Sequence, residues 1–199
     1  MIYMIKRLSL IYIFFISSCN VFTFTPLIPV FKTAIFGVED FEITDEFLAT
    51  REYSFIKVKI GRSAIALFVL FKIDEENNFY WVNSTGEKIV TNNGKIIEIS
   101  GLIKGNFKYT GLAKRSFPDW KETENFLYLA EFFDPRAYFS FESALEFDDI
   151  NSVLKEKVFV KDLNWRFDNY YEYKGDLTVH SKQTVHPQLP ILTIDYFYK

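Results

Sequence analysis

The clearest structural pattern in this sequence is WRFDNYYEYK, residues 165–174, in which aromatic side chains alternate with mostly polar ones. The two faces of an extended chain would carry Trp165, Phe167, Asn169, Tyr171 and Tyr173 on one side and Arg166, Asp168, Tyr170, Glu172 and Lys174 on the other. Successive side chains of a strand point to opposite faces, so this alternation predicts a half-buried antiparallel strand. Gly175-Asp176 would form the turn that follows it.

Outward from this strand, short apolar runs separated by turn residues fill most of the chain. Further strands are expected at 53–60, 64–73, 79–83, 87–91, 95–100, 126–133, 137–147, 153–160, 177–185 and 190–198. Asn92-Asn93-Gly94 predicts a hairpin turn, because Asn and Gly tolerate positive φ. No alternation of strands and helices is present. The expected fold class is therefore all-β, an antiparallel meander that forms a barrel, a half-barrel or a sandwich.

The run from Ile65 to Phe71 is apolar on both faces of a strand. We expect this strand to lie deep in the sheet. The run is too short to span a membrane, and no other segment has the length and polarity of a membrane span.

Composition narrows the function classes. The chain has 199 residues, with 26 acidic and 23 basic side chains and a formal net charge of −3. No basic patch indicates a nucleic-acid partner, and no phosphate-binding glycine loop or nucleophile motif is present. The 23 Phe and 12 Tyr residues accompany scarce Gly and Pro. We attribute this composition to base-composition drift in the genome and do not take the aromatic content as a sign of ligand binding.

The N-terminal residues have the pattern of a secretory signal. Lys6 and Arg7 precede an apolar run, and small residues lead to Cys19, the only cysteine of the chain. Ile16-Ser17-Ser18-Cys19 resembles the lipobox of bacterial lipoproteins. That resemblance implies cleavage before Cys19 and lipid attachment to its sulfur. Loss of Lys6 and Arg7 with the signal would change the net charge from −3 to −5.

The expected domain organisation has three parts. Residues 1–18 are the lipoprotein signal peptide, 19–30 a lipidated tether with two prolines, and 31–199 a single all-β periplasmic domain. One or two short helices are expected near the start of this domain, over 31–36 and 46–51. About 180 residues are enough to bury one core.

Three further stretches resemble a known family. They are residues 53–62 with the apolar strand that follows, residues 80–102 with Trp81 and Asn92-Asn93-Gly94, and residues 179–190 with His186-Pro187-Gln188-Leu189-Pro190. Together with the lipobox they resemble the YjbF/GfcB family, the group 4 capsule polysaccharide lipoproteins. Residues 105–160 do not align well, and an extra Asn precedes Gly94.

The resemblance implies an outer-membrane lipoprotein that faces the periplasm and acts in exopolysaccharide or capsule assembly or export. Implied partners are an outer-membrane β-barrel protein, a soluble periplasmic companion and the polysaccharide itself. It implies no catalytic residue and no cofactor. Asn20 after the cysteine fits outer-membrane sorting, since an aspartate there would favour retention in the inner membrane.

Few residues suggest chemistry. His180 and His186 are the only histidines, and only Asp195 is an obvious third ligand, so no metal site is expected. The acids at 74–76 are expected in a solvated loop. Asp148 and Asp149 are poor candidates for a catalytic pair, because adjacent residues of a strand point to opposite faces.

The three tryptophans are candidates for stacking on sugar rings. Trp81, Trp120 and Trp165 have flat faces suited to pyranoses, although tryptophans in sheet proteins are usually in the core. Trp120 is the strongest candidate because it falls in an expected loop.

Three functions remain open from the sequence. The first is a non-catalytic accessory lipoprotein, tethered beside polysaccharide machinery. The second is a lipid or hydrophobe carrier with an apolar half-barrel groove. The third is a glycan-modifying enzyme, which requires a cleft with converging acids or a metal.

Overall fold

The computed structural model describes residues 44, 46, 48, 50–110 and 125–199. The expected signal peptide, Cys19, the tether, the helix at 31–36 and Trp120 lie outside these residues. The helix expected at 46–51 falls where only some positions are described. The described part of the chain contains no helix long and apolar enough to cross a membrane.

The described residues form twelve strands and a short 3₁₀ turn, η2 (Lys161–Leu163). The strands are β1 (Phe55–Ile60), β2 (Ala66–Ile73), β3 (Asn78–Val82), β4 (Lys88–Asn92), β5 (Lys95–Ser100), β6 (Phe107–Thr110), β7 (Asn125–Phe133), β8 (Arg136–Asp148), β9 (Val153–Val160), β10 (Trp165–Lys174), β11 (Leu177–Gln183) and β12 (Leu192–Phe197). The all-β prediction is confirmed. β6 falls in the weakly patterned segment 105–160 and was not predicted.

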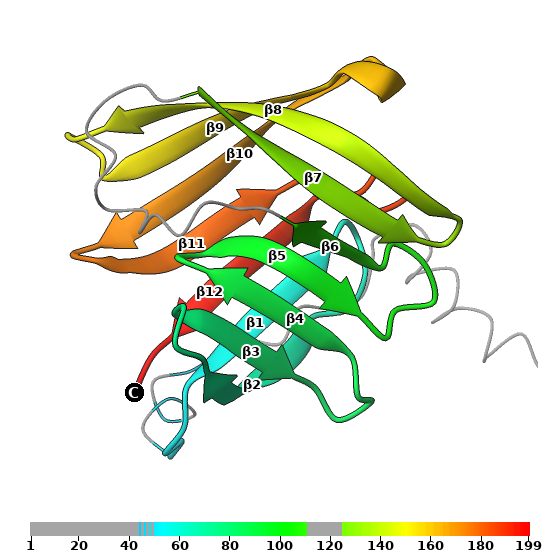
Figure 1. Ribbon diagram of the computed structural model, residues 1–199. Coiled ribbons are helices and arrows are strands. Elements are labelled where there is room, and N and C mark those ends of the chain that lie inside the picture. Colours follow the sequence, from blue (N-terminus) through cyan, green and yellow to red (C-terminus); the bar gives the residue numbers. More distant parts are fainter. Residues whose placement is uncertain (1–43, 45, 47, 49, 111–124) are drawn as a thin grey trace, which may run out of the picture. The chain divides into compact units, whose positions relative to one another are not determined.

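Each strand pairs with the next in an antiparallel meander, and β1 pairs with β12 to close a barrel. Figure 1 shows β1 and β12 side by side at this closure. The closing register runs from Phe55 opposite Phe197 to Ile60 opposite Leu192. Of the three architectures expected from the sequence, the barrel is the one that forms.

The alternation that predicted β10 is observed in full. Asn169 and Tyr171 are buried inside the barrel, and the intervening residues are exposed. Around the barrel, inward rings pack into a large aromatic core, and a smaller cluster forms around Tyr171. Tyr128 stacks on Phe141 with centroids 5.3 Å apart, and Tyr109 meets Tyr128 edge to face at 4.7 Å. Such ring pairs stabilise the core beyond the area that they bury.

The prediction that the second strand lies buried on both faces is wrong. Val69 and Phe71 of β2 are exposed on the outside, Phe71 by 75%. A barrel has one interior face, and the outward side chains of β2 meet solvent. Phe71 also stands at a break in the register between β2 and β3.

One end of the barrel is covered by the loop between β11 and β12. His186 packs its ring on Phe132 of β7, with centroids 4.2 Å apart. The backbone N–H of Gly61, in the β1–β2 turn, donates to the carbonyl of Ile191. Leu189 lies so close to Gly105, before β6, that a Cβ there would be 2.3 Å from its side chain. The loop thus contacts three separate parts of the barrel.

The hairpin turn between β4 and β5 leans inward at the other end. Asn93 and Gly94 have φ of +46° and +83°, which confirms the turn predicted there. A Cβ on Gly94 would lie 2.4–2.7 Å from side-chain atoms of Thr178 in β11. Glycine is therefore required for its conformation and for its close approach to β11.

Gly94→Ala is expected to lower the free energy of unfolding by about 2–4 kcal/mol, because strain at positive φ adds to overpacking against Thr178. Gly86→Ala is the matched control. Gly86 has φ of +84° but open space around it, so its loss is expected to be about 1–2 kcal/mol. Urea unfolding of both variants makes the comparison, and equal losses would show that the contact with Thr178 contributes nothing.

Candidate functional site

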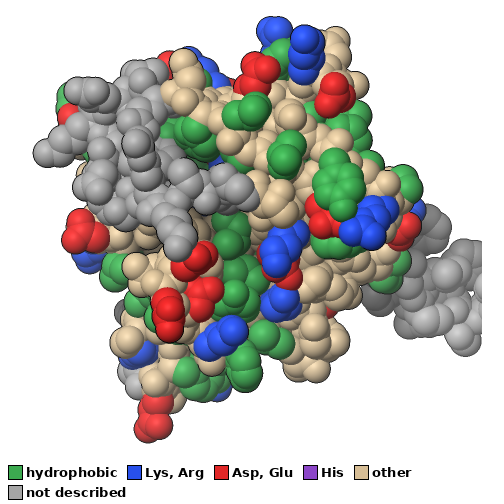
Figure 2. Space-filling model, viewed as in Figure 1, with side chains coloured by type: hydrophobic (Ala, Val, Ile, Leu, Met, Phe, Trp, Pro, Cys, Tyr) green, Lys and Arg blue, Asp and Glu red, His purple; other side chains and the backbone are tan. Residues whose placement is uncertain are grey.

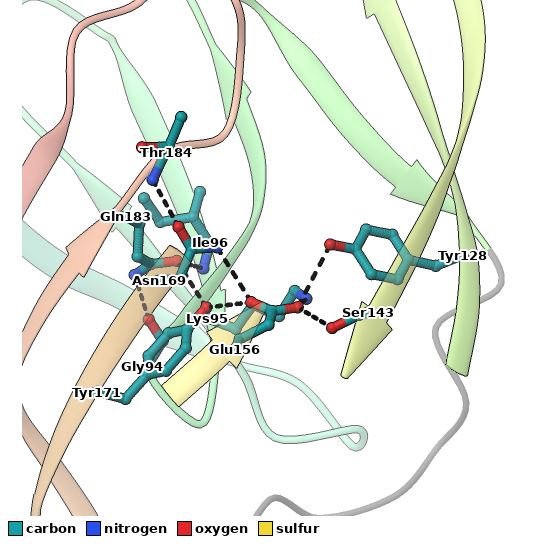
Figure 3. Close-up of polar contacts among 10 residues, drawn as sticks. All are labelled: Gly94, Lys95, Ile96, Tyr128, Ser143, Glu156, Asn169, Tyr171, Gln183 and Thr184. Atoms are coloured by element: carbon teal, nitrogen blue, oxygen red, sulfur yellow. Dashed lines mark hydrogen bonds and ion pairs between the residues drawn. The ribbon is translucent and has the colours of Figure 1, made fainter. Parts of the chain in front are cut away.

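A charged pair lies inside the barrel and joins two strands that are not neighbours. Lys95, at the start of β5, forms an ion pair with Glu156 of β9 (Figure 3). Their side chains are 3% and 0% exposed, so neither charge reaches solvent. The Lys95 ammonium also lies over the Tyr128 ring, 4.1 Å from its centroid.

Glu156 is surrounded by hydrogen-bond donors. Besides Lys95, these are Ser143 (2.7 Å), Tyr171 (2.8 Å), Asn169 (3.1 Å) and Tyr128 (3.4 Å). Burial opposes ionisation, but the charge of Lys95 and these hydrogen bonds hold the pKa of Glu156 below its usual value. Burial lowers the pKa of Lys95 against the attraction of Glu156. A carboxyl group surrounded by donors is an ionised acceptor, and Lys95 is its counter-ion.

Gln183 of β11 fixes the β4–β5 turn from across the barrel. Its Nε2 donates to the carbonyl of Gly94 at 2.7 Å, and its Oε1 accepts from the N–H of Ile96 at 2.9 Å. The hydroxyl of Tyr196 donates to the same Gly94 carbonyl at 2.8 Å. Figure 3 shows Gln183 beside Gly94 and Ile96. The polar cluster therefore holds a turn of one wall against the opposite wall.

This cluster is enclosed, so it has no access to a substrate. Its acid, amides and hydroxyls satisfy one another, and the aromatic core fills the adjacent interior. The described strands present a packed interior where a lipid carrier would need an apolar groove. The role of the cluster is therefore to stabilise the fold.

The sequence contained part of the signal for this cluster. Alternation in the strand expected at 153–160 places Glu156 on the same face as Leu154 and Val158, and an acid on an apolar face needs a buried partner. No local pattern identified that partner. Lys95 is 61 positions away in the chain.

The tryptophans proposed for sugar stacking lie in different environments. Trp81 is 0% exposed, and its Nε1 donates to the hydroxyl of Thr91 at 2.9 Å, so its ring has no free face. Trp165 is half-buried against Phe167, with ring centroids 4.3 Å apart. Trp120 and the lipid-attachment candidate Cys19 lie outside the described residues.

The two histidines are not brought together. Nδ1 of His180, on the outside of β11, lies 2.6 Å from Oδ1 of Asp195, whose other oxygen is 3.3 Å from Lys57. The hydrogen bond with Asp195 raises the pKa of His180, and burial opposes it only in part. Burial lowers the pKa of His186 in the end loop. In the described part of the chain, no three His, Cys, Asp or Glu residues are grouped to hold a metal ion.

The acid clusters act as turn caps. Asp74 accepts from the backbone N–H groups of Glu76 and Asn78, and Asp148 from those of Ile150 and Asn151. Each carboxylate is thus committed to its own turn.

The candidate binding site is a shallow trough on the outside of the long strands β7–β10. It lies between two outward rows that cross these strands. The rows are Leu127, Glu142, Phe159 and Arg166, and Asn125, Ala144, Lys157 and Asp168. Ala144 is the smallest of these side chains and stands between Asn125 and Lys157, which leaves the surface hollow there.

The trough combines apolar and charged groups. The guanidinium carbon of Arg166 lies 4.6 Å from the centroid of the Phe159 ring. Lys157 pairs with Glu146 at 2.6 Å, at one rim. The sequence did not predict this site, because a hollow on a sheet depends on which side chains become cross-strand neighbours.

Comparisons with known proteins identify the fold. No protein-family model matches the chain, and no curated protein matches its sequence. The crystal structure of the hypothetical lipoprotein YmcC from Escherichia coli (K12) is similar, with a TM-score of 0.63 and 14% sequence identity. The match covers 85% of this chain and 94% of that one. At this identity the likeness shows a shared fold.

Lys95→Met is expected to lower the free energy of unfolding by about 3–5 kcal/mol, because it leaves the charge of Glu156 buried without its counter-ion. The double variant Lys95→Met/Glu156→Gln is expected to lose less than Lys95→Met alone, since both charges are then absent. Urea unfolding measures all three proteins. Lys182→Met, at an exposed position of β11, should stay within about 0.5 kcal/mol of the wild type. Additive losses in the double variant would contradict the coupling.

His180→Gln is expected to change how stability depends on pH. Because the folded-state pKa of His180 is raised above 6.5, its contribution is complete below that pH and is lost as the pH rises through the folded pKa. The stability difference between wild type and variant should therefore be largest in mild acid and shrink in mild alkali. Unfolding curves from about pH 5 to about pH 9 test this. A constant difference would show that the contact between His180 and Asp195 is not linked to protonation.

Proposed function

We propose that this chain is a lipoprotein anchored in the outer membrane through Cys19, and that it is a non-catalytic accessory in the assembly or export of exopolysaccharide or capsule. The observation that carries the proposal is a combination. A lipobox-like Ile16–Cys19 segment precedes a barrel whose fold is similar to that of a protein described as a hypothetical lipoprotein.

The stretches that resemble the capsule lipoprotein family occupy structurally demanding positions. Trp81 is fixed in the core, Asn93-Gly94 forms the inward turn, and 186–190 covers one end of the barrel. Residues at such positions specify a fold more than a reaction. Their placement supports common architecture with that family and fits an accessory role.

The proposed mechanism is local concentration. Lipid chains on Cys19 would hold the barrel at the periplasmic face, next to an outer-membrane β-barrel protein and a periplasmic companion. One acyl chain gives only marginal binding, at about 0.8 kcal/mol per buried CH₂, so two or three chains are expected. Tethering raises the effective concentration of a domain near a membrane partner without new contacts.

A non-catalytic role agrees with how the described acids are used. Glu156 is sealed in the barrel, and Asp74 and Asp148 cap turns. In the outward trough, the two paired strands place Glu142 directly across from Phe159, not from a second acid. The glycan-modifying alternative would require two carboxyl groups facing each other across a cleft.

Deletion of the gene is expected to lower the amount of polysaccharide at the cell surface, and re-expression of the wild-type chain should restore it. Cys19→Ser is expected to leave the precursor unlipidated and to restore little, because the barrel is then not held at the membrane. Membrane fractionation and a surface polysaccharide assay on the same cultures measure both effects.

Ser18→Ala is the matched control, since it keeps a small residue before the cysteine and should be lipidated and active. Unchanged surface polysaccharide after deletion would contradict the accessory role. Mature lipidated protein from the Cys19→Ser gene would contradict the anchor.

A further inference from the structure

The trough on β7–β10 has side chains that are free to meet a ligand. Within the described residues, neither Glu142 nor Arg166 has an ion-pair partner, although cross-strand pairing places both beside Phe159. At the same row, Leu127 is 62% exposed. An exposed apolar surface rimmed by polar groups is typical of a binding site.

We infer that this trough binds a segment of a polysaccharide chain. The inference rests on the proposed function, because it names the ligand through which the anchored barrel would act. The apolar side of a sugar ring fits against Phe159 and Leu127. The planar carboxylate of Glu142 accepts hydrogen bonds from sugar hydroxyls, and the guanidinium of Arg166 donates to them in a fixed fork.

The dimensions of the site suit a polymer. The row from Leu127 to Arg166 crosses four adjacent strands, which corresponds to about 15 Å at the spacing between strands. The trough is shallow and open along this line, so it can accept the middle of a chain. Its second row adds the amide of Asn125, which also bonds to hydroxyls, and Asp168, whose carboxylate pairs with Lys155 at 2.8 Å.

Other macromolecules fit the trough less well. A peptide that adds a strand needs a free sheet edge, and the closed barrel of the described strands has none. Glu142 and Asp168 repel the phosphates of nucleic acids and anionic lipids, and they balance Arg166 and Lys157. The trough therefore has a net charge close to zero, and its polar side chains lie between apolar ones. This surface suits a polyhydroxylated chain. Figure 2 shows one face of the molecule, where hydrophobic side chains lie among charged ones.

The test is native affinity electrophoresis of the full lipidated chain in detergent, in gels cast with surface polysaccharide extracted from the organism that encodes it. The wild type is expected to be retarded. Glu142→Ala/Arg166→Ala should raise the apparent dissociation constant by at least about tenfold. Phosphatidylglycerol vesicles form a second arm, measured by co-sedimentation.

The matched control is Glu172→Ala/Lys182→Ala, which removes one acid and one base from exposed positions of β10 and β11. It should bind like the wild type, and urea unfolding checks that both double variants are folded. Absence of retardation in the wild type, or equal retardation of both double variants, would overturn the inference. Trough-dependent binding to vesicles without polysaccharide retardation would overturn it in favour of a lipid surface.

These outcomes separate the site from the proposed function. If gene deletion lowers surface polysaccharide but the purified chain is not retarded, the accessory role is supported and the binding site at the trough is contradicted. If deletion leaves surface polysaccharide unchanged while retardation still depends on the trough residues, the binding site is supported and the accessory role is contradicted.

Discussion

The ion pair between Lys95 and Glu156 is the constraint on which the barrel interior depends. A buried pair adds little net stability, because desolvation offsets most of the attraction, but a wrong pairing is heavily penalised. A slip of one residue in β5 would turn Lys95 outward and leave Glu156 unpaired. The pair therefore fixes the register of β5, and with it the inward turn at Gly94 that Gln183 and Tyr196 hold from the far wall.

The two ends of the barrel are closed by different means. One end uses a glycine turn held by polar contacts, and the other uses the loop around His186, held mostly by packing on Phe132 and Gly105. Between the two ends, packed aromatic side chains fill the interior. Groups that can meet a ligand therefore lie on the outside, among them Glu142 and Arg166 of the trough on β7–β10.

Local patterns predicted most strands but not how they close. β5, β9 and β10 match the expected ranges, because alternation and turn residues act over a few positions. The burial of β2 was wrong because an apolar run does not tell whether a second layer covers it. Closure through β1 and β12, the partner of Glu156, and the hollow above Ala144 all depend on residues far apart in sequence. The lipobox-like segment that ends at Cys19 is a local pattern, so the sequence alone suggests the anchor, which stays a prediction.

The closing strand pair also has a mechanical consequence. β1, the first strand after the N-terminal segment, is bonded on both sides, by β2 and by β12, and Lys199 donates its backbone N–H to the hydroxyl of Ser54 just before β1. Tension applied to the chain ahead of β1 along the strand would load both ladders in shear, so many hydrogen bonds would have to yield at once. If the chain is anchored ahead of β1, these two ladders would oppose unfolding of the barrel under a pulling force.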